Sequence, residues 1–402
     1  RSRPGRIAGF RSGTEDGVFR GFALETRMFA SSVIAFYSNK PVSGRIDTEA
    51  VLTGFSATET FRTPVDLEKR NASRERVIGG VLSVDVMPGL ELSAKAIHGK
   101  YLHRLDLPAA GGPSGPAFGS AGVSMAFTTR VMSCWGEVAA QGNARAMTGG
   151  LEFDVADRGS MALSAARLGR GFSRVFGSVR SAVEEEAFQM VGRVNVTRNL
   201  SLDGTWFLSS YPSGKDGTGF SGTDHSAGLL VDGRIAANVR LSLRYRTRKL
   251  TESEGVKHSQ GILVRVQYDR KSLTWALRTE YTRVAADPRH VEYGFLTAQE
   301  LTYRPDTWLE VRWKTTLFGT ESYDSRLYVH DPDVPGTVVN RAVFGRGSRS
   351  VLHIRMHPLD VLELSATYSR EIKDSEDVIG SGPDELKGDS FGRYSLQADL
   401  RF

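Results

Sequence analysis

The chain has 402 residues, of which 40% are hydrophobic and 24% charged, and 52 basic against 46 acidic residues give a formal net charge of +6. No stretch approaches the roughly 18 consecutive apolar residues of a transmembrane helix, which excludes a helical membrane protein. The basic residues are spread along the chain, so charge alone is weak evidence for nucleic-acid binding, and the single cysteine, Cys134, excludes an intrachain disulfide.

The composition also indicates the class of fold. The 43 glycines, 20 phenylalanines and 12 tyrosines are typical of many strands joined by turns. The sequence starts without methionine and without the apolar core of a signal peptide. We therefore expect either that a signal has been removed or that the chain is a piece of a longer protein.

Apolar residues recur at every second position along most of the chain. The pattern is present in segments 22–28, 90–96, 151–155, 188–196 and 200–208, and it is clearest in 239–246, 262–269, 273–281, 309–317, 362–368 and 394–402. A helix would need apolar residues three and four positions apart. The period of two therefore predicts an all-β chain.

The connections between these segments alternate between short and long. The short ones lie at 29–32, 87–89, 156–159, 197–199, 269–272, 304–306 and 357–360. The long ones lie at 40–73, 103–116, 170–185, 211–224, 250–259, 284–292, 318–349 and 370–389. The connection at 141–144 breaks this alternation. Short periplasmic turns and long extracellular loops are the arrangement of an outer-membrane barrel.

We therefore predict one domain, residues 1–402, that forms a closed antiparallel transmembrane β-barrel. Strands with one apolar and one charged face fit a tilted crossing of the hydrocarbon layer, and closure pairs every backbone group. We expect about 20 strands, within a range of roughly 18 to 22. A soluble β-sandwich or propeller is the alternative. The lack of a repeat of roughly 40 to 50 residues and the mixed charges on successive strands favour the barrel.

Two sets of side chains follow from the alternation. The polar set should face the lumen: Arg240, Arg244, Arg246, Arg265, Arg278, Glu280, Glu310, Arg312, Lys314, Glu363, Asp399 and Arg401. The apolar set should face lipid: Leu241, Leu243, Trp275, Trp313 and Leu400. Buried charge must be paired or hydrated, so the lumen is wet, cross-linked by ion pairs, or both. Because arginine outnumbers acid in 240–314, the wall either favours anions or is a neutralised, stiff interior.

The last segment, 394–402, is amphipathic up to its final residue. Tyr394 and Leu400 lie on its apolar side, and the chain ends on Phe402. This pattern resembles the assembly signal of bacterial outer-membrane proteins, which is read as the closing strand. The resemblance implies a location in the bacterial outer membrane and recognition by the outer-membrane insertion machinery.

Several stretches resemble one family more closely. They are GVFRGFALE, AFYSNKPVSGRIDTE and FRTPVDLEKRNASRERVIGG in the first 80 residues, and SRLYVHDPDVPG, FGRGSRSVLHIRMHP and VIGSGPDELKGDSFGRYSLQADLRF in the last 80. They are similar to the barrel region of a porin-like Bacteroidota/Chlorobi outer-membrane family, whose barrel commonly follows helix-hairpin-helix modules. This chain departs from that pattern because it lacks the modules. The resemblance implies fold and location, contact with other envelope proteins, and nucleic acid only indirectly, through modules upstream.

One loop contains a helix signal. In RTPVDLEKRN, Thr63 suits an N-cap, Pro64 the first helical position and Asp66 the third position after the cap. Such a helix either folds into the barrel mouth as a constriction or lies on the surface of an extracellular loop.

The remaining candidate residues do not indicate catalysis. His353 and His357 share a strand face about 13 Å apart, too far for one metal ion. The loop acids Asp331, Asp333, Asp374, Glu376 and Asp377 lack the spacing of an EF-hand and are better explained as solvated. Motifs of serine hydrolases, zinc proteases and P-loops are missing from the sequence. We expect no metal site, no cofactor and no enzymatic activity.

The function that these patterns favour is a pore or conduit for polar solutes through a charged lumen. A constriction would be set by loop 41–73 or loop 318–349. The alternative is a membrane anchor or assembly component that displays periplasmic DNA-binding or partner-binding modules. In both cases the lipid bilayer is a partner.

Overall fold

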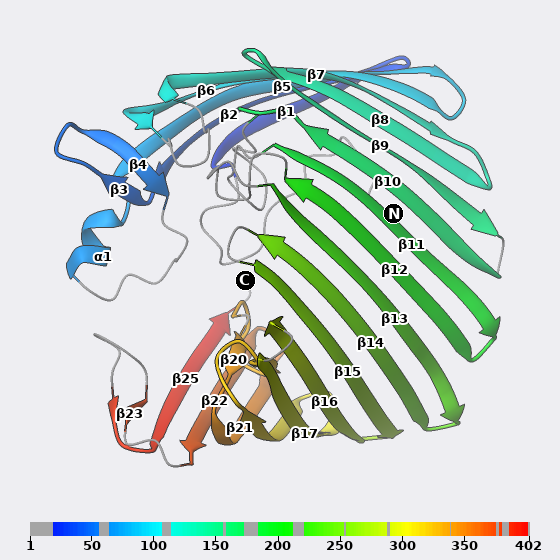
Figure 1. Cartoon of the computed structure of the whole chain (residues 1–402), viewed down its shortest axis with the longest axis vertical. Helices are drawn as coiled ribbons and strands as arrows, with labels where there is room; N and C mark the ends of the chain where they lie inside the picture. The colour runs from blue at the N-terminus through cyan, green and yellow to red at the C-terminus, as the bar shows by residue number, and fades with distance from the viewer. Residues whose placement is uncertain are drawn as a thin grey trace. The chain divides into compact units, whose positions relative to one another are not determined.

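A computed structural model of the chain describes residues 19–55, 64–106, 114–155, 158–172, 184–211, 221–252, 255–287, 290–337, 339–374, 378–379 and 386–400. These residues form strands almost throughout, together with one short helix (Figure 1). Within these ranges, no helix has the length and apolar character needed to cross a membrane.

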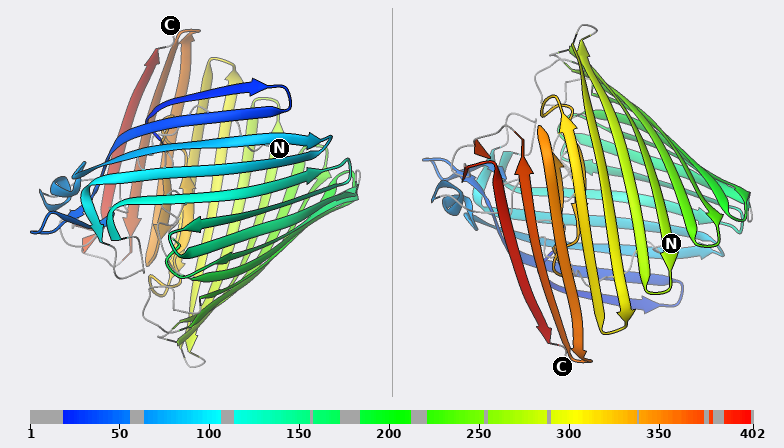
Figure 2. Two further views of the ribbon diagram at one scale, coloured as in Figure 1. Left: turned by 90° about the horizontal axis from the view of Figure 1, so that it is seen from above. Right: turned by 90° about the horizontal axis from the view of Figure 1, so that it is seen from below.

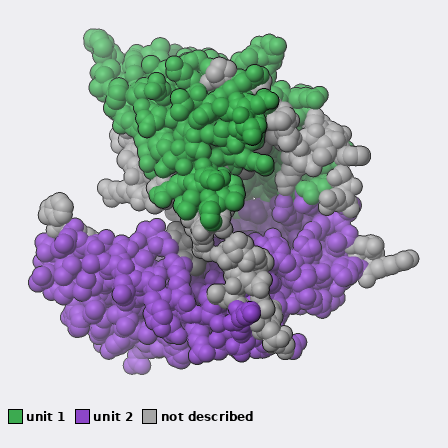
Figure 3. Space-filling model, turned by 90° about the vertical axis from the view of Figure 1, so that its left-hand side faces the viewer, with its two compact units in different colours: residues 1–192, 206–225, 251–254 green, residues 193–205, 226–250, 255–402 purple. Residues whose placement is uncertain are grey.

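The chain divides into two compact units, drawn in different colours in Figure 3. Unit 1 comprises Arg1–Gly192, Trp206–His225 and Thr251–Glu254, and unit 2 comprises Arg193–Thr205, Ser226–Leu250 and Gly255–Phe402.

The elements of unit 1, in chain order, are β1 (Gly21–Met28), β2 (Ser31–Val42), β3 (Gly44–Ile46), β4 (Val51–Phe55), α1 (Pro64–Lys69), β5 (Ser73–Met87), β6 (Leu90–Asp106), β7 (Ser114–Thr128), β8 (Met132–Gln141), β9 (Ala144–Val155) and β10 (Gly159–Leu168). Four strands contribute residues to both units: β11 (Glu185–Thr197), β12 (Leu200–Tyr211), β13 (Gly222–Ala236) and β14 (Val239–Glu252).

The remaining strands belong to unit 2. They are β15 (Gly255–Arg270), β16 (Leu273–Asp287), β17 (His290–Asp306), β18 (Leu309–Thr320), β19 (Leu327–Asp331), β20 (Val339–Val343), β21 (Arg346–Leu359), β22 (Leu362–Lys373), β23 (Val378–Ile379), β24 (Leu386–Lys387) and β25 (Ser390–Leu400).

Among the described strands, 21 are hydrogen-bonded in one sheet, while β19–β20 and β23–β24 form separate pairs. Consecutive strands pair antiparallel, as in β5–β6, β8–β9, β15–β16 and β17–β18, and run side by side in Figure 2. The predicted all-β, antiparallel architecture is confirmed, and the number of strands in the main sheet lies within the expected range.

Two connections that the sequence predicts to be long, 250–259 and 284–292, are mostly strand. β14 continues to Glu252 and β15 begins at Gly255, while β16 continues to Asp287 and β17 begins at His290. A strand ladder needs only backbone groups in register, so it extends beyond the residues whose side chains alternate cleanly.

The predicted loop helix is present as α1, which begins at Pro64; Thr63 lies outside the described residues. Lys69 Nζ lies 3.2 Å from Asp66 Oδ1, an ion pair between residues three apart on the helix. No residue of α1 is buried.

Each strand presents two faces. We call the face that carries the ion pairs the charged face, and the opposite one the apolar face. In unit 1 the charged face carries Lys40 and Glu75, whose side chains are almost fully buried and 3.7 Å apart, and Lys95 and Glu137, 2.7 Å apart.

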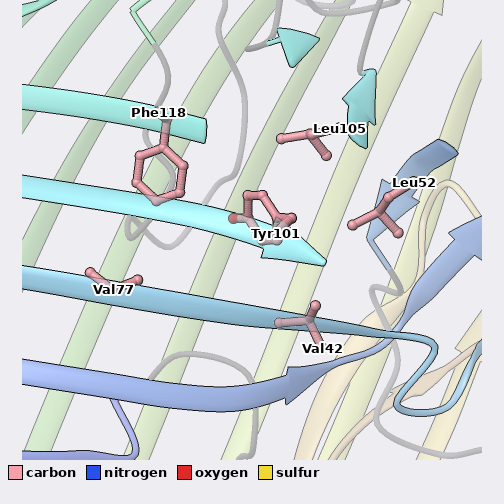
Figure 4. Close-up of a cluster of buried hydrophobic side chains, with 6 residues drawn as sticks. All are labelled: Val42, Leu52, Val77, Tyr101, Leu105 and Phe118. Atoms are coloured by element: carbon pink, nitrogen blue, oxygen red, sulfur yellow. The ribbon is translucent and has the colours of Figure 1, made fainter. Parts of the chain in front are cut away.

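A buried apolar cluster lies on the charged face of unit 1, near the ends of β5 and β6 (Figure 4). Val77, Tyr101 and Phe118 come from β5, β6 and β7, and Tyr101 Oη donates to Glu75 Oε2 over 2.9 Å. The cluster is completed by Val42, Leu52 and Leu105, and β4 pairs in parallel with β6. Part of the predicted loop 41–73 is therefore fixed against the sheet.

The two faces predict opposite accessibility in a bilayer. In a Cys134→Ser background, we expect Leu243→Cys to be protected from a charged thiol reagent by lipid, and Arg240→Cys on the charged face to react. The measurement is the labelled fraction in liposomes, with denatured protein as the full-reaction control. The reverse order of reactivity would contradict the assignment of the faces.

Candidate functional site

The structure brings the predicted charged residues together on one face of unit 2. Arg265 is paired with Arg278 across β15 and β16, and Glu363 with Asp399 across β22 and β25. Cross-strand partners project from the same face. Arg240 and Arg244 reach Asp232 and Glu280 on that face, and strand alternation adds Arg246, Glu310, Arg312 and Lys314. Arg401 lies outside the described residues.

The predicted lipid-facing residues lie on the opposite face. Leu243, Trp313 and Leu400 are 42%, 51% and 68% exposed. Trp313 is paired with Leu301 and Leu352, and Trp275 with Leu301 and Tyr268, while Leu241 shares the face by alternation. In the last strand, the Tyr394 ring lies 4.8 Å from that of Tyr368, and Phe402 is outside the described residues.

A hairpin inserted between β18 and β21 covers part of the charged face. Its strands, β19 and β20, pair from Leu327 with Val343 to Asp331 with Val339. Leu327, Val329 and Asp331 are buried, while Tyr328 and His330 between them are exposed. One side of the hairpin therefore packs against the sheet, and the predicted loop 318–349 contains an ordered element.

Apolar contact accounts for one part of this docking. Leu327, Val329 and Val343 of the hairpin form a buried cluster with Leu296 and Ala298 of β17 and Phe318 of β18. Burying a Val or Leu side chain fully contributes about 1.5–3 kcal/mol. These contacts therefore supply the main favourable free energy of docking.

Ion pairs link the same hairpin to the wall. Asp331 of the hairpin lies 2.7 Å from Arg349 Nε and 3.6 Å from Lys314 Nζ, and all three side chains are 7% exposed or less. Glu371 of the wall lies 3.4 Å from Arg349 and 2.9 Å from Arg341 of the hairpin. Arg278 also donates to the Tyr328 carbonyl over 3.0 Å. Such buried charges tolerate little displacement, so the network fixes the position of the hairpin.

Apart from the buried pairs of Lys314 and Arg349, several ion pairs of this face share an asymmetry in exposure. The side chains of Glu310, Glu363 and Glu371 are 12%, 3% and 3% exposed. Their arginine partners stand further out, with exposures of 54% for Arg304, 32% for Arg312, 36% for Arg355 and 35% for Arg341. A long arginine side chain reaches over a short acidic one. In these pairs the outermost charge is therefore guanidinium.

The inserted hairpin was not predicted, although the sequence contains a signal for it. Two strands each carry adjacent apolar residues that face opposite sides, Phe295–Leu296 and Leu317–Phe318. Leu296 and Phe318 interrupt the charged face and are buried by the hairpin. An apolar residue on a polar face is the local sign that another segment covers it.

No family model and no curated protein matches the sequence. Among solved structures, the ferric enterobactin receptor PfeA from Pseudomonas aeruginosa is similar, with a TM-score of 0.51 at 10% identity over 94% of this chain and 69% of that chain. The FrpB iron transporter from Neisseria meningitidis gives a TM-score of 0.50 at 9% identity, over 94% of this chain and 71% of that chain. The chain therefore has the fold of outer-membrane β-barrel proteins.

The ion network predicts that Asp331→Asn loosens the hairpin. Removing one partner of a buried pair costs about 3–5 kcal/mol, because Lys314 and Arg349 keep their charge. We expect tryptic cleavage after Arg341 to accelerate by roughly two to three and a half orders of magnitude while the sheet stays intact. The measurement is the cleavage rate of the folded protein followed by mass spectrometry.

The matched control is Asp324→Asn in the segment that leads into the hairpin. Asp324 pairs with Lys257 at 2.6 Å, but both side chains are exposed, and the hydrogen bond from Lys257 lowers the pKa of this carboxyl. An exposed pair contributes about 0–1 kcal/mol, so cleavage should change little. Equal rates for the two variants would show that Asp331 does not hold the hairpin.

Proposed function

We propose that the protein closes into a bacterial outer-membrane barrel that conducts polar solutes and prefers anions. The observation that carries the proposal is the layer of exposed arginines over buried carboxylates on the charged face of unit 2. The fold shared with outer-membrane barrels supports the location, with the lipid bilayer and the insertion machinery as partners. Strand alternation supports the assignment of the charged face to the lumen.

The selectivity would arise from electrostatics alone. Each of these exposed arginines is paired with a carboxylate, and its positive end stands closer to a passing solute than the carboxylate below it. A low-dielectric wall strengthens the resulting potential. The guanidinium group also offers a planar pair of donors that matches carboxylate and phosphate groups. Carboxylates and phosphates are therefore the solute groups that this face fits.

The hairpin β19–β20 would set the narrowest part of the passage. It projects Tyr328 and His330 away from the wall, and its docking hides Lys314 and Arg349. Solutes would therefore meet a partly aromatic segment between arginine-rich surfaces.

One observation favours the alternative function. A hairpin held by buried ion pairs is suited to a permanently narrowed or closed lumen. In that case the barrel would serve as a membrane anchor or assembly component for envelope partners. The resemblance to the Bacteroidota/Chlorobi family, in which helix-hairpin-helix modules precede the barrel, supports this alternative.

The anion preference is tested by recording single channels in planar bilayers under a salt gradient. We compare the wild type with Arg312→Gln/Arg355→Gln, in which Glu310 keeps Arg304 and Glu363 keeps His357 as partners. One unit charge about 4 Å from an ion in water is worth about 1 kcal/mol, so the anion-to-cation permeability ratio should fall roughly fivefold.

The matched control is Arg283→Gln/Arg370→Gln, which removes two arginines from the apolar face of the same unit. This variant should retain the selectivity of the wild type. A folded wild-type protein that never conducts would favour the anchor. Conduction with no change in selectivity between the two double variants would sink the role given to the arginines.

A further inference from the structure

Four basic residues cluster on the apolar face of unit 1, at the end of the strands that is away from the short β5–β6 turn. Arg74 and Arg76 lie on β5, and Lys100 and Arg104 lie on β6. All four side chains are exposed, while Glu75 and Tyr101 beside them point to the charged face and are buried. We call these four residues the basic cluster.

The basic cluster carries more positive charge than its surroundings on this face balance. Arg76 and Lys100 are direct cross-strand partners, an arrangement of like charges that destabilises a sheet. Within the described part of the chain, none of the four residues has a hydrogen bond or ion pair through its side chain. Along β5, β7 and β8, the described residues of this face include no Asp or Glu, and on β6 the one acid of this face is Asp106, two residues beyond Arg104. The cluster therefore has the charge of a binding site for an anion from outside the chain.

An apolar groove of about 1140 Å³ lies further along the same face of unit 1. Its lining includes Leu82 of β5, Leu92 and Ala94 of β6, Met125 of β7 and Val138 of β8. No side chain fills the floor of the groove where Gly136 of β8 is directly opposite Gly149 of β9. β5 pairs with β6, β6 with β7 and β7 with β8, so these strands lie side by side (Figure 2, left).

The basic cluster and the groove share two strands. Leu82 is six residues from Arg76 along β5, and Ala94 is six residues from Lys100 along β6. Six residues of strand span about 20 Å, a distance that a saturated acyl chain covers. Between them on this face lie Ile78, Gly80, Ala96 and His98, which include no acid and leave an uninterrupted path.

We propose that this face binds a phosphate-bearing membrane lipid, with the anionic head group at the basic cluster and the acyl chains in the groove. Charge complementarity selects the head group, and the apolar lining selects the chains. A free anion would use the cluster and leave the groove empty. A neutral lipid would occupy the groove and leave the opposed cations unpaired.

The test is native mass spectrometry of the full chain in detergent, titrated with dipalmitoyl phosphatidic acid. Dipalmitoyl phosphatidylcholine has the same chains with a zwitterionic head group, and inorganic phosphate supplies the head group without chains. We expect the wild type to retain phosphatidic acid in preference to both. In Arg76→Gln/Lys100→Gln the affinity for phosphatidic acid should fall roughly 30-fold. The control is Arg130→Gln/Arg158→Gln, which changes two arginines at the end of the strands where the short turns lie. Its affinity for phosphatidic acid should equal that of the wild type.

A second variant separates a lipid site from an ion site. A Cβ on Gly136 would meet no atom closer than 3.8 Å, so Gly136→Leu fits the backbone and fills the groove. We expect it to weaken binding of phosphatidic acid, while Gly192→Leu, where a Cβ meets nothing within 4 Å, has no effect.

Equal binding of phosphatidic acid by Arg76→Gln/Lys100→Gln and by its control would overturn the proposal. So would equal retention of phosphatidylcholine. If inorganic phosphate binds as strongly as phosphatidic acid, and Gly136→Leu binds phosphatidic acid as the wild type does, the face holds an ion site only. Circular dichroism of each variant confirms that the sheet is folded before binding is compared.

Discussion

The properties of the charged face depend on how a short acidic side chain and a long basic one share a strand surface. Carboxylates such as Glu363 and Glu371 stay close to the backbone and are buried, while Arg355 and Arg341 extend over them. Each pair satisfies its own charge and leaves the positive end outermost. The same rule makes the face stiff, because moving an arginine would remove part of the charge that balances a buried carboxylate. A wall that is nearly neutral overall therefore still presents positive charge at its surface.

The hairpin β19–β20 uses both kinds of contact, and they contribute differently. Burial of Leu327, Val329 and Val343 supplies the favourable free energy, at about 1.5–3 kcal/mol for each side chain. The pairs around Asp331 add little net stability, because desolvation offsets the attraction between the charges. They do fix the docked position, since a shift would break contacts that Lys314 and Arg349 cannot replace. The apolar contacts hold the hairpin on the sheet, and the ion pairs determine where it sits.

Alternation along the strands was sufficient to predict the all-β class and the antiparallel order, because side-chain direction has a period of two in any strand. It also assigned Arg244, Arg278 and Glu363 to one face and Trp313 to the other. The hairpin was beyond that reasoning, since the docking of 327–343 depends on residues such as Leu296 that are distant in sequence. The excess of arginine indicated that the wall presents positive charge. The exposure of the arginine side chains depends on packing, which residue spacing does not encode. To predict that Arg76 lies opposite Lys100, the register of β5 against β6 must be known, and residue spacing alone does not determine it.

The most direct test of this account is the single-channel conductance of a variant without the hairpin. Thr320 and Gly345 are joined by hydrogen bonds of 2.8 and 3.0 Å, so residues 321–344 can be replaced by an Asn-Gly turn that joins β18 to β21 directly. If the hairpin narrows a charged passage, the variant conducts several-fold more current than the wild type and remains selective for anions. If the two proteins conduct equally, or if neither conducts while both are folded, the hairpin does not control a solute path and the account is wrong.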